Sequence, residues 1–213
     1  MRIKTFQGGF DKNFSYLAWC DKTNIASIID PAVPIISMVE EIEKNNLILD
    51  KILITHTHHD HIFYLEDWLH LFPNVEIICS NKTTQANFEF HAIDHNEIIT
   101  IGEEIFICLY TPGHFYNSMC YWNKDKKILF TGDTVFVGRT GRTKDLRSNI
   151  KDLYNSIYNI ILKLPENTMI YPGHHYGYIK SISIKDNIVC SDFFRCKTFD
   201  QFKKIMDNFE LKR

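Results

Sequence analysis

The sequence predicts an α/β domain, because short apolar segments typical of strands alternate with amphipathic segments typical of helices. The chain has 213 residues, of which 45% are hydrophobic, enough for one ordinary domain or at most two small ones. No low-complexity linker and no repeat of fixed period divides the sequence. We therefore expect residues 1–213 to form a single domain of mixed strands and helices.

The first thirty residues are expected to form strands with an antiparallel start. Residues 13–20 are aromatic and apolar, and residues 24–30 form an isoleucine-rich segment that stops at Pro31. A helix is expected over 35–42, where apolar residues recur at helical spacing after Pro34. Further along, the pattern predicts strands over 51–55 and 75–79, with a short helix between them that ends near Pro73.

The second half is predicted to hold three antiparallel strands, over residues 105–110, 115–122 and 127–131. Residues 148–164 place their apolar side chains on one helical face, and a strand is expected over 168–171. The segment 198–213 is predicted to be a short C-terminal helix that packs on the chain's own core. A face for binding a partner is the alternative.

Charge and composition exclude several classes of partner. The 24 Lys and Arg residues against 26 Asp and Glu give a formal charge of −2, which predicts no nucleic-acid binding. No segment approaches the about eighteen apolar residues of a membrane span, and residues 1–10 lack the apolar stretch of a signal peptide. The six cysteines include no C-x-x-C pair, which favours reduced core residues. We expect a cytoplasmic protein with no membrane partner.

Four of the ten histidines lie within six positions, directly after the predicted strand 51–55. Alternate side chains of an extended segment point the same way, so His56 and His58 can bind one metal ion. Asp60 and His61 follow where the chain turns toward the next helix, and they can reach a second ion nearby. His59 has the opposite parity, and we expect it at the surface or behind the ligands.

Three later segments repeat the order of an apolar strand, a turn that contains glycine, and a residue of a metal-ligand type. Those residues are His114, Asp133 and His174. We expect the four strand ends to meet at one rim and to supply five imidazoles and two carboxylates. That set is enough for two ions of the zinc, iron or manganese kind. Three other histidines lack this context and are expected to be ordinary residues: His70, His91 and His95.

These motifs resemble those of the metallo-β-lactamase superfamily over essentially the whole chain. The H-x-H-x-D-H cluster at 56–61 and the order of the three later ligands match its pattern. Within the superfamily, T-G-D-T-V-F-V-G at 131–138 and Y-P-G-H-H-Y at 171–176 are most similar to the glyoxalase II (hydroxyacylglutathione hydrolase) branch and its relative, the persulfide dioxygenase. The resemblance implies a four-layer αββα sandwich that holds one or two metal ions at the sheet edges.

The resemblance also implies residue roles. The seven ligands form two sets that share one carboxylate: His56, His58 and His114 for the first ion, Asp60, His61 and His174 for the second, and Asp133 as the bridge. Asp60 and Asp133 would be catalytic as well, since they orient the attacking hydroxide. Arg142 and Tyr176 match positions that contact the glutathione moiety. The alternatives for these two are a salt-bridging surface arginine and a tyrosine packed on the rim.

Three departures from the branch bear on the substrate. After His174 only residues 175–213 remain, too few for the helical C-terminal domain of glyoxalase II. Residues 62–64 read Ile-Phe-Tyr where the branch has small residues, which is expected to narrow one wall of the pocket. The turn at 139–142 lacks the cysteine that the branch carries there.

The predicted function is hydrolysis of a small thioester of the hydroxyacylglutathione type by a metal-bound hydroxide. Two divalent ions are expected, zinc first, with iron or manganese as alternatives. A thiolate leaves without a dedicated acid because its pKa is about 8.5. Two alternatives stay open: a mononuclear-iron glutathione persulfide dioxygenase with iron on His56, His114 and Asp133, and a non-catalytic metal-binding protein blocked by Phe63 or Tyr64. The expected partner is a small thioester or thiol-derived molecule, and the expected assembly a monomer or homodimer.

Overall fold

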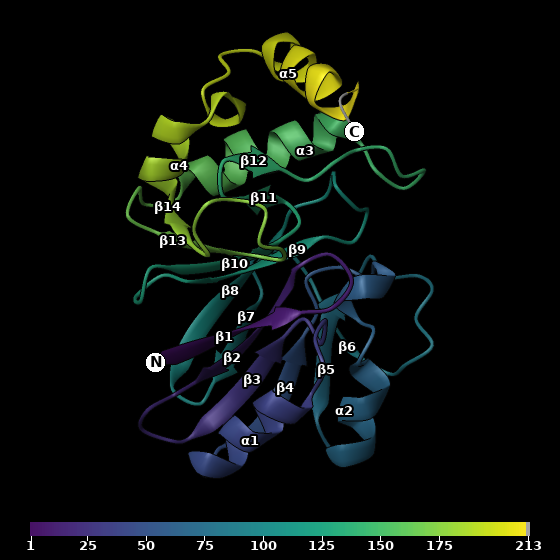
Figure 1. Cartoon of the computed structure of the whole chain (residues 1–213), viewed down its shortest axis with the longest axis vertical. Coiled ribbons are helices and arrows are strands. Elements are labelled where there is room, and N and C mark those ends of the chain that lie inside the picture. Colours follow the sequence, from purple (N-terminus) through teal and green to yellow (C-terminus); the bar gives the residue numbers. More distant parts are fainter. Residues whose placement is uncertain (212–213) are drawn as a thin grey trace.

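The computed structural model describes residues 1–211 and contains two six-stranded β-sheets (Figure 1). The first sheet has the spatial order β1 (Arg2–Gly8), β2 (Asn13–Trp19), β3 (Ile25–Ile29), β4 (Ile48–Leu53), β5 (Glu76–Ser80) and β6 (His91–Ile93). The second has the order β14 (Ile182–Ser183), β13 (Met169–Pro172), β10 (Ile128–Gly132), β9 (Met119–Asn123), β8 (Glu104–Tyr110) and β7 (Ile98–Ile101). A short ribbon pairs β11 (Val135–Phe136) with β12 (Arg139–Thr140).

The strand directions confirm the antiparallel pairings predicted for the start and the middle of the chain. Strands β1, β2 and β3 pair antiparallel, and β3 to β6 continue in parallel. In the second sheet β7 to β10 are antiparallel, whereas β10 and β13 run in parallel. Strands β4, β10 and β13 therefore each have a parallel neighbour. Parallel strands are joined by crossover connections, so loops leave the ends of these strands.

The helices cover the outer faces of the two sheets (Figure 1). Helices α1 (Ile36–Lys44) and α2 (Leu65–Leu71) lie on the first sheet. Helices α3 (Ile150–Asn155), α4 (Ile184–Cys190) and α5 (Phe199–Leu211) lie on the second. Short helical segments complete the set: 3-10 turns at η1 (His59–His61), η3 (Ile161–Lys163) and η4 (Asp192–Phe194), and a π-helical turn at η2 (Ser156–Ile160). The layer order is the predicted αββα sandwich.

Three apolar cores hold these layers together. Because alternate side chains of a strand point to opposite faces of the sheet, one strand can contribute to two of these cores. On β2, Tyr16 points between the sheets, where its ring centroid lies 5.2 Å from that of Phe130. The next residue, Leu17, points to the opposite face and packs in the core that contains Trp68 of α2. Both faces of the strand are buried, so its sequence reads as a continuous apolar run.

Several boundaries differ from the prediction. The strand expected over 115–122 begins only at Met119, because residues 115–118 form a loop that packs the Phe115 ring 4.0 Å from that of His58. The helix expected over 148–164 is present as α3 followed by the turns η2 and η3. The strand expected at 51–55 covers Ile48–Leu53.

The C-terminal helix packs on the chain's own core, as expected, since Phe202 and Met206 of α5 are buried. The Phe202 ring lies 5.5 Å from that of Tyr154 in α3. The prediction extended this helix to residue 213, but residues 212 and 213 lie outside the described part of the chain. That residues 1–213 form one domain stays a prediction.

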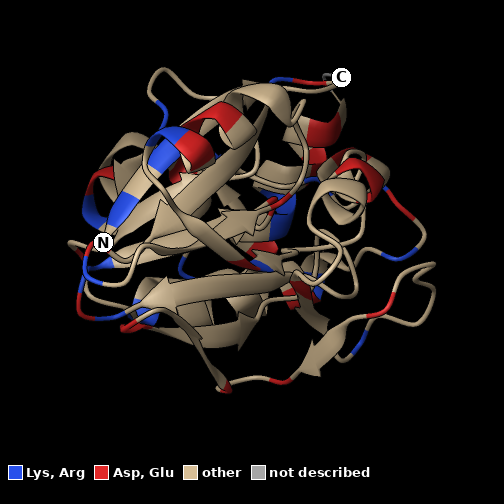
Figure 2. Ribbon diagram, turned by 90° about the horizontal axis from the view of Figure 1, so that it is seen from below, with Lys and Arg blue, Asp and Glu red and all other residues tan. Residues whose placement is uncertain are grey.

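The charged residues are mixed along the ribbon, with basic and acidic segments interspersed around the molecule (Figure 2). Such mixing agrees with the formal charge of −2. Within residues 1–211, no helix has the length and apolar character that crossing a membrane requires.

Candidate metal centre

The structure brings the seven predicted ligand residues together, and we call this cluster the candidate metal centre. Each part of the cluster follows the end of a strand. The segment that begins at His56 comes after β4, His114 after β8, Asp133 after β10 and His174 after β13. Two backbone hydrogen bonds join the sheets beside the cluster, from Phe14 N to Gly173 O (2.7 Å) and from Met119 N to Thr55 O (2.7 Å). The expected convergence of four strand ends is therefore present.

Glycines allow this close approach. Gly132 has φ +48° at the end of β10, a left-handed conformation that favours glycine. A Cβ atom there would collide with the Thr55 hydroxyl, which sits just before the ligand cluster. A Cβ at Gly173 would collide with Asp133 Oδ1 and come within 2.6 Å of His61 Cε1. The backbone thus packs directly against the ligand side chains.

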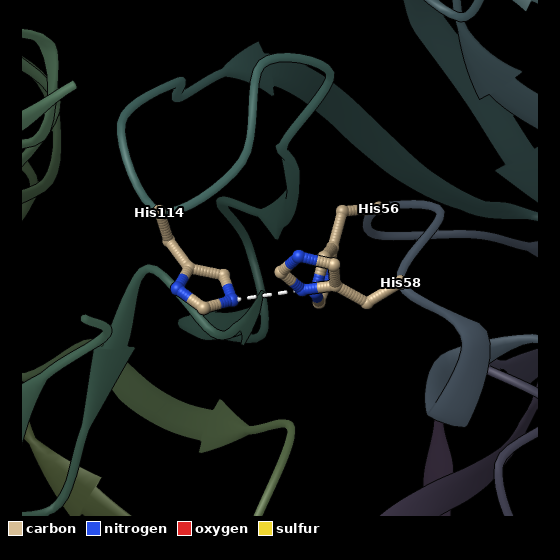
Figure 3. A group of neighbouring side chains, drawn as sticks. All are labelled: His56, His58 and His114. Carbon is tan, nitrogen blue, oxygen red and sulfur yellow. Dashed lines mark hydrogen bonds between the residues drawn. The ribbon is translucent and has the colours of Figure 1, made fainter. Parts of the chain in front are cut away.

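The first group of ligand atoms comes from His56, His58 and His114, whose rings converge in Figure 3. His58 Nδ1 lies 2.9 Å from His56 Nε2 and 3.0 Å from His114 Nε2. Two nitrogens bound to one tetrahedral zinc ion at 2.0–2.1 Å would be about 3.3 Å apart. Three imidazole nitrogens that face one point at nearly this spacing fit a metal ion.

The second group comes from Asp60, His61 and His174. His61 Nε2 and His174 Nε2 are 3.2 Å apart, and Asp60 Oδ2 lies 3.4 Å from His174 Nε2. These atoms also face a common point. The 3-10 turn η1 makes this possible, because it turns Asp60 and His61 away from the direction of the preceding strand.

Asp133 lies between the two groups. Its Oδ2 is 3.4 Å from His114 Nε2 and 3.3 Å from His174 Nε2, and its Oδ1 is 3.1 Å from His61 Nε2. Oδ1 is buried, and because His61 Nε2 is close but not aligned for a hydrogen bond, Oδ1 has no hydrogen-bond partner among the described residues. A buried carboxylate oxygen without a partner is costly unless a cation compensates it, so this atom fits a metal ligand.

The protonation states of His56, His58 and Asp133 suit metal binding. Burial, and next the charge of His114, lower the pKa of His58 to about 4, and burial lowers the pKa of His56 well below its usual range. Burial disfavours the ionised form of Asp133, but His174 and His61 outweigh it and hold the pKa of Asp133 well below its usual value. Neutral imidazoles and an ionised carboxylate are the forms that coordinate metals. At His61 and His174 burial lowers the pKa, but Asp133 outweighs it and raises the pKa of both, to about 9 for His174, so metal binding would displace a proton from each.

Four of the five ligand imidazoles, all except His58, have a hydrogen-bond partner at Nδ1, the ring nitrogen that faces away from the metal position. The partners are Thr55 Oγ1 for His56 (3.1 Å), Asp30 Oδ2 for His61 (2.8 Å), the Arg142 carbonyl for His114 (2.9 Å) and the Asp11 carbonyl for His174 (2.9 Å). Asn13 Nδ2 donates to Asp60 Oδ2 (2.8 Å). Such partners fix the ring orientation and raise ligand basicity.

Sequence reasoning missed Asp30 and Asn13 as partners of the ligands. Asp30 is 1% exposed and follows β3, so it is a carboxylate at the end of an apolar strand, like Asp133 after β10. That signal was present in the sequence. Asn13 carries no such signal, because its amide reaches Asp60 across 47 positions in the chain.

The two predicted substrate residues lie beside the cluster. Arg142 and Tyr176 line a crevice of about 30 Å³ together with His114 and Asp133. Arg142 is exposed, whereas the Tyr176 hydroxyl donates to Asp11 Oδ2 (2.6 Å). The Tyr176 ring stacks on the His174 ring at 4.8 Å. The crevice is therefore rigid on its tyrosine side and open to solvent at its arginine.

His59 lies outside the ligand groups, as the parity of the strand predicted. Its ring is exposed and packs 5.8 Å from that of Phe10 and 5.0 Å from that of Phe63. Phe63 and Tyr64 thus contribute to an aromatic surface next to the ligands. Phe63 makes its ring contacts with Phe10, His59 and Tyr64.

This fold and site define a protein of the αββα class with adjoining histidine and carboxylate groups that could hold metal ions. The family model described as the metallo-beta-lactamase superfamily matches residues 8–174, and the chain belongs to this superfamily. The membership predicted from the motifs is confirmed.

Two proteins of similar sequence and one solved structure resemble the chain over most of its length. The chain is 34% identical over 173 residues to a Schizosaccharomyces pombe protein named probable hydroxyacylglutathione hydrolase glo2, covering 79% of this chain and 66% of that protein. It is 28% identical over 207 residues to the probable polyketide biosynthesis zinc-dependent hydrolase PksB of Bacillus subtilis, covering 95% and 90%. The crystal structure of ETHE1 from Myxococcus xanthus has a TM-score of 0.88 at 26% identity and covers 98% of this chain and 91% of that one. The chain thus spans about two thirds of the yeast relative but most of the other two.

Proposed function

We propose that the protein is a metal-dependent hydrolase of a small thioester of the hydroxyacylglutathione type. The observation that carries the proposal is that two ligand groups adjoin at Asp133 and open beside a crevice lined by Arg142 and Tyr176. The relative named as a hydroxyacylglutathione hydrolase supports the substrate class. Hydrolysis adds water to the acyl carbon and breaks the C–S bond, so that a carboxylate, a thiol and a proton form.

The chain's own residues have separate tasks in this reaction. The first group and the second group would each hold one ion, with Asp133 between them. Bound metal ions would supply a water molecule with a pKa of about 7 and polarise the acyl carbonyl. Asp60 and Asp133 would orient that water, and Asn13 keeps Asp60 in place through its amide.

The leaving group needs no dedicated acid from this site. The phenol of Tyr176, which lines the crevice, already donates its proton to Asp11, and burial together with this hydrogen bond raises the pKa of Tyr176 far above 10. A thiolate with a pKa of about 8.5 leaves unprotonated, whereas an amide nitrogen would require a proton. The site therefore favours a thioester over an amide.

Turnover of S-lactoylglutathione and a panel of other acylglutathiones by protein loaded with zinc, iron or manganese tests the proposal. We expect thiol release that depends on metal, and two ions per chain by elemental analysis. The variant Asp133→Asn, with the same volume, is expected to lose both. No turnover with any of the three metals would rule the proposal out.

A persulfide dioxygenase is the second candidate. His56, His114 and Asp133 provide the two histidines and one carboxylate of a mononuclear iron site, with His114 Nε2 3.4 Å from Asp133 Oδ2. One iron per chain and stoichiometric oxygen consumption with glutathione persulfide would support it. Two ions per chain and no oxygen uptake would exclude it.

The remaining expectations have their own measurements. A non-catalytic protein blocked by Phe63 or Tyr64 predicts that no small anion reaches the metals, which inhibition by fluoride or acetate would contradict. Zinc as the native metal is supported by the name of the zinc-dependent relative and is tested by metal analysis of protein from unsupplemented cells. A monomer or homodimer is tested by light scattering, and a cytoplasmic location by cell fractionation.

A further inference from the structure

A cavity of about 460 Å³ lies next to the candidate metal centre, between η1, α2 and residues 87–88. Most of its lining is apolar: Ile62, Phe63, Leu65, Leu69 and Phe88. The volume lies in the range of small-molecule binding pockets. It is far larger than the crevice of about 30 Å³ beside Arg142.

Two segments of the chain connect the cavity to the metal centre. His59 lines the cavity and stands between the ligands His58 and Asp60 in the chain. The tip of the β1–β2 hairpin contacts both places through consecutive residues. The Phe10 ring lies 4.6 Å from that of Phe63, while the Asp11 carbonyl accepts the hydrogen bond of His174.

The charges on the two sides of the centre differ. The crevice side carries the exposed guanidinium of Arg142, which suits the carboxylates of a glutathione moiety. The residues lining the cavity include the carboxylate of Glu66 and, within the described chain, no Lys or Arg. An anionic thiol carrier therefore fits the crevice side, and an uncharged apolar group fits the cavity.

We propose that this cavity binds the apolar acyl chain of the thioester, so that the preferred substrate carries a longer acyl group than lactoyl. This inference rests on the proposed function. A lactoyl group has five non-hydrogen atoms and fills about 150 Å³ if each takes the volume of a water molecule, about 30 Å³. An acyl chain would also cover Phe10 and Phe63, which are 62% and 43% exposed beside the centre.

Binding of the carboxylate products to the metal-loaded protein tests the cavity without requiring turnover. We expect the Kd from calorimetry to tighten roughly fourfold for each added methylene from butanoate through hexanoate to octanoate. The variant Leu69→Trp fills the cavity and is expected to weaken octanoate at least tenfold while leaving acetate unchanged. Leu71→Trp is the matched control, since Leu71 is on the same helix, 51% exposed and outside the lining.

The outcomes separate the two proposals. A Kd that does not change with chain length in the wild-type protein overturns the acyl cavity, whatever the fate of the variants. Equal octanoate binding by folded Leu69→Trp and Leu71→Trp proteins overturns it too. Turnover of lactoylglutathione without any preference for longer acyl groups leaves the hydrolase standing and removes the cavity from its substrate site. Chain-length-dependent binding without turnover of any acylglutathione keeps the cavity as a binding site for an acyl chain and rules out the acylglutathione hydrolase.

Discussion

The carboxylate of Asp30 lies 2.8 Å from Nδ1 of His61 and also accepts both the backbone N–H and the hydroxyl of Thr55, each at 2.7 Å. One buried side chain thus orients a ligand of the second group and anchors the residue that precedes the first group. Asp30 contacts none of the ligand atoms that face the metal positions. Its effect on metal binding would pass through His61 and Thr55.

Replacement of Asp30 by Asn should weaken metal binding without removing a ligand. An amide of the same size offers one acceptor oxygen in place of two, so either His61 or Thr55 loses a partner. We expect a 10- to 100-fold loss of affinity for at least one ion, measured by competition with a chelator. Asp50→Asn is the control, because Asp50 pairs with Lys51 away from the ligands. Wild-type affinity for both ions in Asp30→Asn would contradict the prediction.

Substitution of Gly173 by Ala should disrupt the centre from the backbone side. The added Cβ would collide with Asp133 Oδ1 and lie 2.6 Å from His61 Cε1. Elemental analysis is expected to show less than half of the wild-type metal content. Gly8→Ala is the matched control, since its Cβ would meet neighbours only at 3.4 Å or more. Full metal occupancy in Gly173→Ala would contradict the prediction, because it would mean that Asp133 and His61 can move aside for the added Cβ and still bind metal.

Removal of the Arg142 side chain should impair substrate binding but not metal binding. His114 is oriented by the backbone carbonyl of Arg142, which the variant Arg142→Ala retains. We expect KM for a glutathione thioester to rise roughly tenfold, with kcat and metal content little changed, as for loss of one charge-assisted hydrogen bond of about 1.5 kcal/mol or more. Lys144→Ala, in the same loop, serves as the control. A fall in kcat alone would refute the binding role.

The cysteines should differ sharply in alkylation. Burial raises the pKa of the Cys79 thiol to about 11 and the pKa values of Cys108 and Cys120 to about 12, whereas Cys190 is exposed. Only the thiolate reacts, so at pH 8 these three buried thiols are almost entirely in the unreactive form. Mass spectrometry after brief treatment with iodoacetamide should find Cys190 modified and the three others intact. Equal labelling of Cys120 in the folded protein would contradict this.

Much of the fold could be predicted because its periodicities are local. The α/β class, the antiparallel pairings and the final helix follow from segments of apolar residues with period two or near four, whereas the four-layer αββα order was implied by the family resemblance. The strand start at 115 was wrong because Phe115 is apolar for a different reason: its ring packs on His58 in a loop. Helix α4 was not predicted, since its seven residues, Ile184–Cys190, are too few to establish a period.

The candidate metal centre could also be predicted only in part. The positions that hold ligand types could be located because each follows a strand end in the sequence, and the structure brings them together. Their metal-binding role stays a prediction. The partners that orient them were missed, because the Asp30–His61 and Asn13–Asp60 contacts depend on which strands become neighbours within the first sheet. The large cavity could not be predicted either, and two of the residues expected to narrow the pocket, Ile62 and Phe63, line it.

The ligands that would share metal ions come from both sheets, with His61 and His174 separated by 113 positions in the chain. Bound ions would therefore act as a staple across a long loop, which an unfolded chain can close only at an entropic cost. They would also stabilise the folded state by mass action, in proportion to the logarithm of the free metal concentration. Metal supply in the cell would then set the lifetime of the protein as well as its activity, and starvation for metal would deplete the protein itself.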